Sequence, residues 1–205
     1  MSSQQDSVRC QFYAKIGACR HGEKCSRKHI RPTSSSTILL SNLYNNPDIS
    51  RTYTNKKTHT TNVVLSEAPQ EKVDEYYRNF YRDVFIECSL VGPVTDFIVC
   101  ENHNDHLNGS VYVRFAQSTD AIKARDLFST RWYDSKPVYC ELSPVTDFEE
   151  ARCRSHEEQG CERGGMCNFW HVKTIKGSKL NEWEKETRGL RLSSKKYWLD
   201  KKLDN

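Results

Sequence analysis

The sequence predicts an α+β protein in which a central β-α-β-β-α-β domain lies between two short metal-binding modules and is followed by a charged helical tail. Three observations predict this architecture: a cysteine–histidine pattern that occurs twice, sheet-domain periodicities between the two copies, and apolar residues at helical intervals near the end of the chain. The expected boundaries are residues 1–34, 35–146, 147–173 and 174–205. With 205 residues, of which 36% are hydrophobic, one large core is not expected.

The cysteine–histidine pattern predicts two zinc sites. The expected ligands are Cys10, Cys19, Cys25 and His29 in the first copy, and Cys153, Cys161, Cys167 and His171 in the second. The last two intervals, of five and three residues, are identical in both copies, which makes a chance occurrence improbable. Three thiolates and one imidazole complete a tetrahedron around Zn²⁺, so we expect two structural zinc ions per chain. Such closed sites leave no position for an activated water, which argues against zinc catalysis.

Composition and missing motifs exclude several classes of protein. No apolar run approaches the roughly 18–20 residues that cross a bilayer, and the polar start Met-Ser-Ser-Gln-Gln-Asp is not a secretory signal. We therefore expect a soluble intracellular protein, whose cysteines bind metal rather than form disulfides. No phosphate-binding loop or nucleophile elbow is visible, so we do not expect an enzyme.

Charge and aromatic residues in the zinc modules favour a nucleic-acid partner. Residues 1–31 carry seven Lys/Arg against two Asp/Glu, whereas residues 32–150 carry 11 against 17. A basic module favours a polyanion, and an acidic domain favours a cationic partner. Aromatic faces stack on unpaired bases and arginines reach phosphates, so small zinc loops of this composition favour single-stranded RNA. The expected RNA-binding residues are Phe12, Tyr13, Arg20, Ser26, Arg27, Arg154, Phe169 and Trp170.

A competing interpretation is that each aromatic residue of the modules only covers its metal site.

The modules are close enough in sequence to the central domain to lie side by side on it, because about ten extended residues between Leu142 and Cys153 span at most roughly 35 Å. We expect both modules on one face of the central domain, and RNA binding that needs both.

The segment between the modules has the periodicities of a sheet domain. Strands are expected at residues 37–44, 94–100, 110–115 and 138–142, and helices at 73–88 and 118–128. Residues 45–69 are polar and are expected to form a long loop or a disordered insertion. The resulting β-α-β-β-α-β order places two helices on one face of a sheet, as in ferredoxin-like domains.

This order and the run Asn108–Phe115 resemble an RNA-recognition motif, which stacks bases on aromatic residues of its sheet. Two of the three aromatic positions are occupied here by Leu39 and Ser110. Because the domain is also acidic, we expect its sheet to be a poor RNA platform.

The run Arg131-Trp132-Tyr133 resembles the Arg-x-aromatic loop of the U2AF homology motif, a variant RNA-recognition domain that binds peptides. The resemblance implies that a tryptophan of the ligand inserts between this loop and the first helix, while basic ligand residues meet acids of that helix. The implied partner-binding residues are Asp83, Glu87, Arg131, Trp132 and Tyr133. A competing interpretation is that Trp132 packs on its own domain.

The order of modules resembles the small subunits of the U2 auxiliary factor, a family of pre-mRNA splicing factors. Runs that carry the resemblance are Lys15–Gly22, Asn108–Phe115, Glu141–Phe148 and Arg163–Phe169. It implies a nuclear protein that recognises the AG at the 3′ end of introns and forms a heterodimer with a large subunit. The tail contains no Arg-Ser repeat, so contacts that use such repeats are not expected.

Three alternatives remain open at this point. The first is a protein-interaction adaptor whose zinc modules only support the central domain. The second is a minor-spliceosome relative of the small subunit, and the third is a tandem zinc-finger factor of mRNA turnover. The last is disfavoured because 123 residues separate His29 from Cys153. RNA binding that depends on Arg27 and Phe12 distinguishes the splicing subunit from the adaptor.

Overall fold

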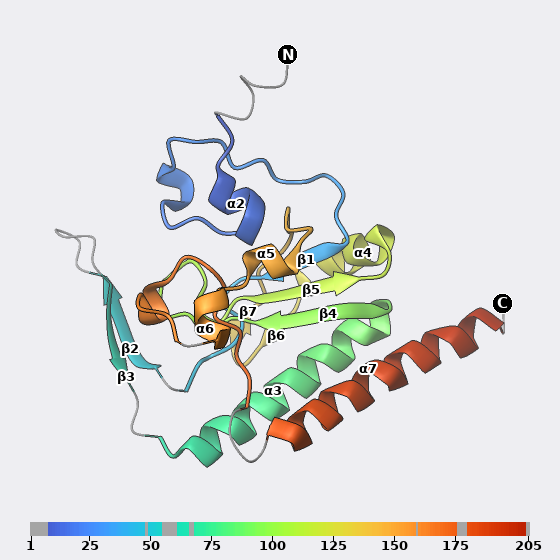
Figure 1. Cartoon of the computed structure of the whole chain (residues 1–205). Helices are drawn as coiled ribbons and strands as arrows, with labels where there is room; N and C mark the ends of the chain where they lie inside the picture. Colours follow the sequence, from blue (N-terminus) through green and yellow to red (C-terminus); the bar gives the residue numbers. More distant parts are fainter. Residues whose placement is uncertain are drawn as a thin grey trace.

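A four-stranded antiparallel sheet forms the centre of the computed structural model (Figure 1). Its strands follow the order β4-β5-β1-β8 and comprise β1 (Thr37–Leu40), β4 (Val94–Val99), β5 (Val111–Phe115) and β8 (Cys140–Leu142). Ile38 of β1 pairs with Val113 of β5 on one side and with Leu142 of β8 on the other, which sets the register of β1 against both neighbours. The residues described by the structure are 8–47, 49–54, 61–65, 68–158, 160–175 and 180–203.

Helices α3 (Gln70–Val91) and α4 (Ser118–Phe128) pack on one face of this sheet. The buried face of α3 repeats at three- and four-residue steps through Tyr77, Phe80 and Val84, as the periodicity predicted. Together β1, α3, β4, β5, α4 and β8 confirm the expected β-α-β-β-α-β order and the α+β fold class.

The structure corrects the prediction for residues 45–69. Strands β2 (Ile49–Thr54) and β3 (Thr61–Leu65) form an antiparallel hairpin where a loop or disordered insertion was expected. Both segments are rich in Thr, Val and Ile, whose β propensity offsets the polar composition of the segment. A second hairpin pairs β6 (Trp132–Tyr133) with β7 (Lys136–Pro137) and carries the Arg-x-aromatic run.

The two zinc modules cover the opposite face of the sheet. In Figure 1, α2 of the first module and α5 and α6 of the second lie on the side of the sheet away from α3. The short helices of the modules are α2 (Gln11–Ile16), η1 (Gly22–Lys24), α5 (Phe148–Ala151), α6 (Arg154–Glu158) and η2 (Gly164–Met166). A second apolar core fills the space between them and the sheet.

The tail forms the helix α7 (Leu180–Leu203), which lies beside α3 (Figure 1). Its Trp183 is only 5% exposed, and its ring lies 5.2 Å from that of Tyr77 and 4.9 Å from that of Tyr81. Further along, Nε1 of Trp198 donates to the carbonyl oxygen of Ser89 at 2.7 Å. The helical tail expected from its sequence is thus part of the packed domain.

Candidate metal centres, nucleic-acid surface and partner groove

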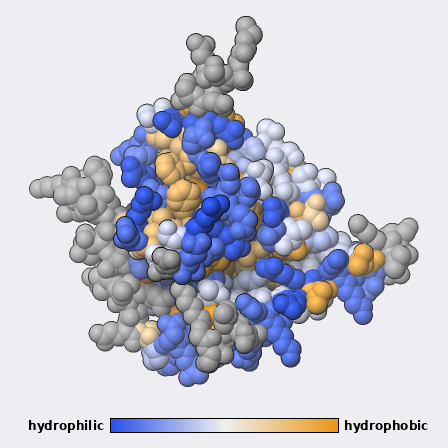
Figure 2. Space-filling view, in the orientation of Figure 1, coloured by the Kyte–Doolittle hydropathy of each residue, from blue (hydrophilic) through white to orange (hydrophobic). Residues whose placement is uncertain are grey.

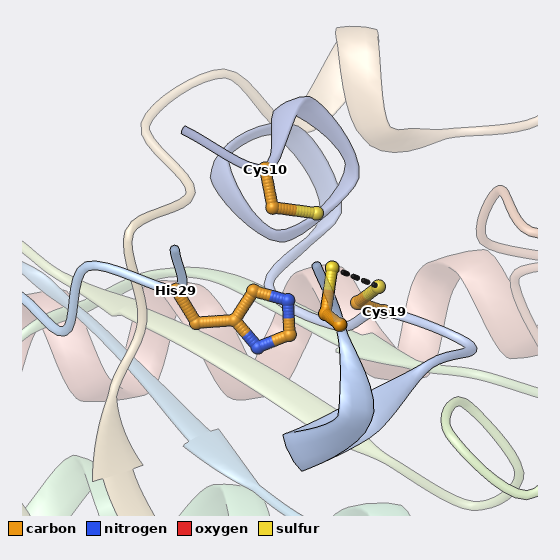
Figure 3. Close-up of side chains that lie close together, drawn as sticks. Cys10, Cys19 and His29 are labelled. Atoms are coloured by element: carbon orange, nitrogen blue, oxygen red, sulfur yellow. Dashed lines mark hydrogen bonds between the residues drawn. The ribbon is translucent and has the colours of Figure 1, made fainter. Parts of the chain in front are cut away.

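The four expected ligands of the first module converge. The ligand atoms of Cys10, Cys19, Cys25 and His29 all lie within 4.8 Å of one another, and Figure 3 shows three of these side chains pointing to a common centre. Cys10 caps α2, because its sulfur accepts the N–H of Tyr13 at 3.5 Å. The ring of Tyr13 stacks on that of His29 at 4.5 Å and orients the imidazole.

The second module repeats this local fold. The ligand atoms of Cys153, Cys161, Cys167 and His171 also lie within 4.8 Å of one another. In both modules the first cysteine donates its backbone N–H to the residue before the histidine: Cys10 to Lys28 at 3.0 Å and Cys153 to Trp170 at 2.9 Å. The repeat seen in the sequence is therefore a repeat in backbone geometry.

The chemistry of both clusters fits zinc. Nε2 of His29 is buried and has no hydrogen-bond partner among the described residues, a costly state that a metal ion relieves. Burial raises the pKa of Cys19 and that of Cys153 to about 11 each, so a cation has to displace their protons, as Zn²⁺ does when it binds thiols. Three sulfurs and one nitrogen are a closed tetrahedral donor set, and the chain holds two structural zinc ions.

The two modules lie side by side. The rings of Phe12 and Phe169 are 6.4 Å apart, and Nζ of Lys15 lies 3.3 Å from a carboxylate oxygen of Glu150. The carbonyl oxygen of Ile16 accepts hydrogen bonds from the hydroxyl of Tyr112 at 2.7 Å and from Nε1 of Trp170 at 3.0 Å. This arrangement agrees with the one expected from the short connection between Leu142 and Cys153.

Six of the eight residues expected to bind RNA reach the surface of the modules. Phe169 is half-buried, and the other five are exposed: Phe12, Arg20, Ser26, Arg27 and Arg154. A cavity of about 630 Å³ opens beside Arg154 and Phe169, and its wall carries both cations such as Lys15 and carboxylates such as Glu150. Figure 2 shows apolar residues among hydrophilic ones on this side of the molecule, around α2. The surface combines rings and cations, as single-stranded nucleic acid requires.

The other two expected RNA contacts, Tyr13 and Trp170, are corrected by the structure. Tyr13 is 8% exposed and stacks on the zinc ligand His29, as the competing interpretation expects. Trp170 is fully buried, and its ring stacks on that of Tyr112 at 4.1 Å. In this conformation neither ring offers an open face to a base, because both are buried.

The expected partner-binding residues surround a groove of about 430 Å³ between α3 and the β6–β7 hairpin. The ring of Tyr133 meets that of Phe80 edge-on at 5.7 Å, and burial, followed by the charge of Asp83, raises the pKa of Tyr133 to about 12. Arg131 forms an ion pair of 2.6 Å with Glu87 across the mouth. Trp132 is 70% exposed, so it does not pack into its own domain.

Comparisons with known proteins agree with this geometry. Residues 5–31 match the family described as zinc finger C-x8-C-x5-C-x3-H type (and similar). The splicing factor U2AF 23 kDa subunit of Schizosaccharomyces pombe is 50% identical over 171 residues, which is 83% of this chain and 74% of that protein. This chain belongs to the U2AF small-subunit family. The splicing factor U2AF 26 kDa subunit of Rattus norvegicus is 45% identical over 175 residues, which is 84% of this chain and 76% of the relative.

The splicing factor U2af 38 kDa subunit of Drosophila melanogaster is another relative. It is 47% identical over 174 residues, which is 84% of this chain and 64% of that protein. The relatives are named as splicing factors and not as enzymes, which agrees with the prediction from the closed zinc sites. Within the described residues, no helix of this chain has the length and apolar composition needed to traverse a bilayer.

Sequence reasoning missed the loop between β4 and β5 (residues 100–110), which contacts the second module. Asn102 and Asn104 of this loop are buried and hydrogen-bond to the backbone of the second module. A loop rich in Asn, Asp and Gly reads as an ordinary turn, and nothing local in the sequence indicates that its amides point to residues some sixty positions away.

Proposed function

We propose that this chain is a nuclear pre-mRNA splicing factor subunit whose two zinc modules cooperatively bind single-stranded RNA at the AG of the 3′ splice site. The observation that carries the proposal is the single surface formed by both modules, on which Phe12 and Phe169 lie 6.4 Å apart. The expected division of labour assigns RNA to residues 1–34 and 147–173, and a protein partner to residues 35–146. The names of the relatives support this class of function.

Each part of the surface has a chemical task. The exposed ring of Phe12 and the half-buried ring of Phe169 are suited to stack on neighbouring unpaired bases, which contributes about 1–3 kcal/mol per base. The exposed guanidinium groups of Arg20, Arg27 and Arg154 are suited to phosphates and to the O6 and N7 acceptors of guanine. The sheet of the central domain does not compete for RNA, because the modules already cover it.

The decisive experiment measures binding of labelled short RNAs that end in AG, AC or CG to the full chain, with and without a zinc chelator. We expect tight binding to the AG RNA only, and loss of binding on chelation. Arg27→Ala combined with Phe12→Ala should weaken binding strongly at unchanged zinc content. Tyr139→Ala, which removes another exposed ring from the central domain, is the control. Unchanged RNA affinity in the double variant would instead favour the adaptor with purely structural zinc modules.

We further propose that the groove beside α3 binds a Trp-containing basic peptide of the U2AF large subunit. The groove has an apolar floor that includes Val84 and Phe128, and acidic side chains at Asp83 and Glu87 on its rim. A tryptophan inserted into such a floor, with cations meeting the rim, is a common hot-spot arrangement. The exposed Trp132 is a second candidate anchor that is free to enter a groove on the partner.

Peptide titrations test this groove separately from RNA. Asp83→Asn should weaken binding of a basic peptide that contains one tryptophan, and should reduce the salt dependence of that binding, because a rim charge is lost. Asp126→Asn, an exposed carboxylate on α4, is the matched control. Equal peptide affinity of both variants, or binding that survives replacement of the peptide tryptophan by alanine, would refute the groove as the partner site.

A further inference from the structure

The loop between β4 and β5 is joined to the second zinc module by a set of buried hydrogen bonds. Asn102 is fully buried, and its Nδ2 donates to the carbonyl oxygens of Cys167 at 3.0 Å and Phe169 at 2.9 Å. Its Oδ1 accepts the backbone N–H of His171 at 2.9 Å. One carboxamide therefore bridges a stretch that contains two zinc ligands and a ring of the RNA surface.

Asn104 adds a second bridge to the same stretch. Its Nδ2 donates to the carbonyl oxygen of Cys167 at 2.7 Å, and its Oδ1 accepts the N–H of Leu107 at 3.0 Å. Beside it, the backbone N–H of His103 donates to the carbonyl oxygen of Gly165 at 2.7 Å. A Cβ on Gly165 would lie 2.3 Å from the ring of His103, so the loop and the module touch without room for a side chain.

The other side of the loop is attached to the sheet. Nδ2 of Asn42, just after β1, donates to the carbonyl oxygens of Asn108 at 2.7 Å and Asp105 at 3.2 Å. Gly109 has a φ of 64°, and a Cβ there would lie 2.0 Å from the carbonyl oxygen of Tyr44. The loop is thus held between the sheet and the second module, and its own conformation is constrained at both ends.

From these contacts we infer that Asn102 and Asn104 are positioning residues for RNA binding: Asn102 acts through the backbone of Phe169, and Asn104 through that of Cys167, two residues before it. The inference rests on the proposed function above. Zinc restrains Cys167 and His171, but the peptide between them carries the ring that faces the first module. The Asn102 carboxamide links the carbonyl oxygen of Phe169 to the N–H of His171, and so sets the direction of that ring relative to Phe12.

The test uses the full chain with Asn102→Ala and, as a milder change, Asn104→Ala. We expect each variant to bind the AG-ending RNA about tenfold more weakly, the size of effect common for groups that orient metal ligands. Zinc content should stay at two ions per chain, the absorption of the Co²⁺-substituted protein should remain that of a tetrahedral site, and binding of the basic tryptophan peptide should not change. Asn79→Ala, an exposed amide on α3, is the matched control.

A further readout separates positioning from local collapse. If only the Phe169 ring is displaced, the slope of log affinity against log salt stays that of the unaltered chain, because the phosphate contacts of Arg154 and its neighbours persist. RNA affinity of both variants equal to that of the unaltered chain would overturn the inference and leave the proposed function standing. Loss of the second zinc ion would also overturn it, since the amides would then only retain the metal. A flattened salt slope would overturn it too, because phosphate contacts and not only the Phe169 ring would have been lost. Failure of the unaltered chain to bind RNA would overturn both proposals.

Discussion

The two zinc modules share one local fold and differ in how they are attached to the sheet. At the position before the histidine ligand, the first module has Lys28, which is exposed, and the second has Trp170, which is fully buried. Both residues accept the backbone N–H of the first cysteine ligand. The metal site therefore determines the backbone conformation at this position, whereas the side chain can either face solvent or pack into the core.

The difference shows that zinc folds a module but does not dock it. The second module is anchored by the Trp170 ring on Tyr112 and by the amides of Asn102 and Asn104, whereas the first presents Ile16 and neighbouring apolar residues to the same core. In RNA-recognition motifs this face of the sheet stacks bases. Here it serves as a packing surface for the modules, and the rings and cations available to RNA lie on the modules themselves.

The largest effect is expected when one zinc site is removed at a time. Cys167→Ser should lower the melting temperature of the central domain more than Cys25→Ser, because the second site also holds the loop between β4 and β5. Each change forfeits much of the metal-linked folding free energy, which is on the order of 10–16 kcal/mol in small zinc peptides. Circular dichroism during heating, together with zinc analysis, measures the effect. Equal shifts for the two variants would contradict the unequal attachment.

Substitution at the equivalent positions sharpens the contrast. Trp170→Ala should reduce the free energy of unfolding by about 3–5 kcal/mol, because it leaves a cavity between the module and the sheet. Lys28→Ala should change it by no more than about 0.5 kcal/mol, as is usual for exposed side chains. Urea unfolding followed by circular dichroism gives both values. A loss below about 1 kcal/mol for Trp170→Ala would mean that the module does not depend on this contact.

The shared RNA surface predicts a smaller but coupled effect. Phe12→Ala and Phe169→Ala should each weaken RNA binding by about 1–3 kcal/mol at unchanged zinc content. Phe169→Ala should also lower the melting temperature, because its half-buried ring packs against the second apolar core. Because the two rings lie 6.4 Å apart, the double variant should lose less than the sum of the single losses. Fluorescence anisotropy with a short AG-ending RNA measures all three. Strict additivity would indicate that the modules bind RNA independently.

The smallest expected effect concerns the ion pair between the modules. Lys15 and Glu150 are 3.3 Å apart, but about half of each side chain is exposed. A double-mutant cycle with Lys15→Ala and Glu150→Ala should give a coupling free energy below about 1 kcal/mol, because solvent screens the pair. A larger coupling in chemical unfolding would show that the first module is docked by charge rather than by Ile16 and its apolar neighbours.

Local patterns alone predicted the parts of the molecule that local chemistry dictates. The zinc ligands were readable because their spacing is short and repeated, and α3 and α4 were readable because their apolar residues recur with the helical period. The groove residues Arg131 to Tyr133 were found from a short motif. By contrast, the hairpin of β2 and β3 was missed because its polar residues outweighed its β propensity.

Only the tertiary structure decided which rings of the modules remain exposed. Nε1 of Trp170 bonds to Ile16, which lies 154 positions earlier in the chain, and the amide of Asn102 bonds to Phe169, which lies 67 positions later. A sequence pattern reports what a residue does with its immediate neighbours. Burial and positioning depend on partners that come together only when the chain folds. The sequence therefore determined the zinc sites and the fold class, and packing decided which rings of the modules stay at the surface.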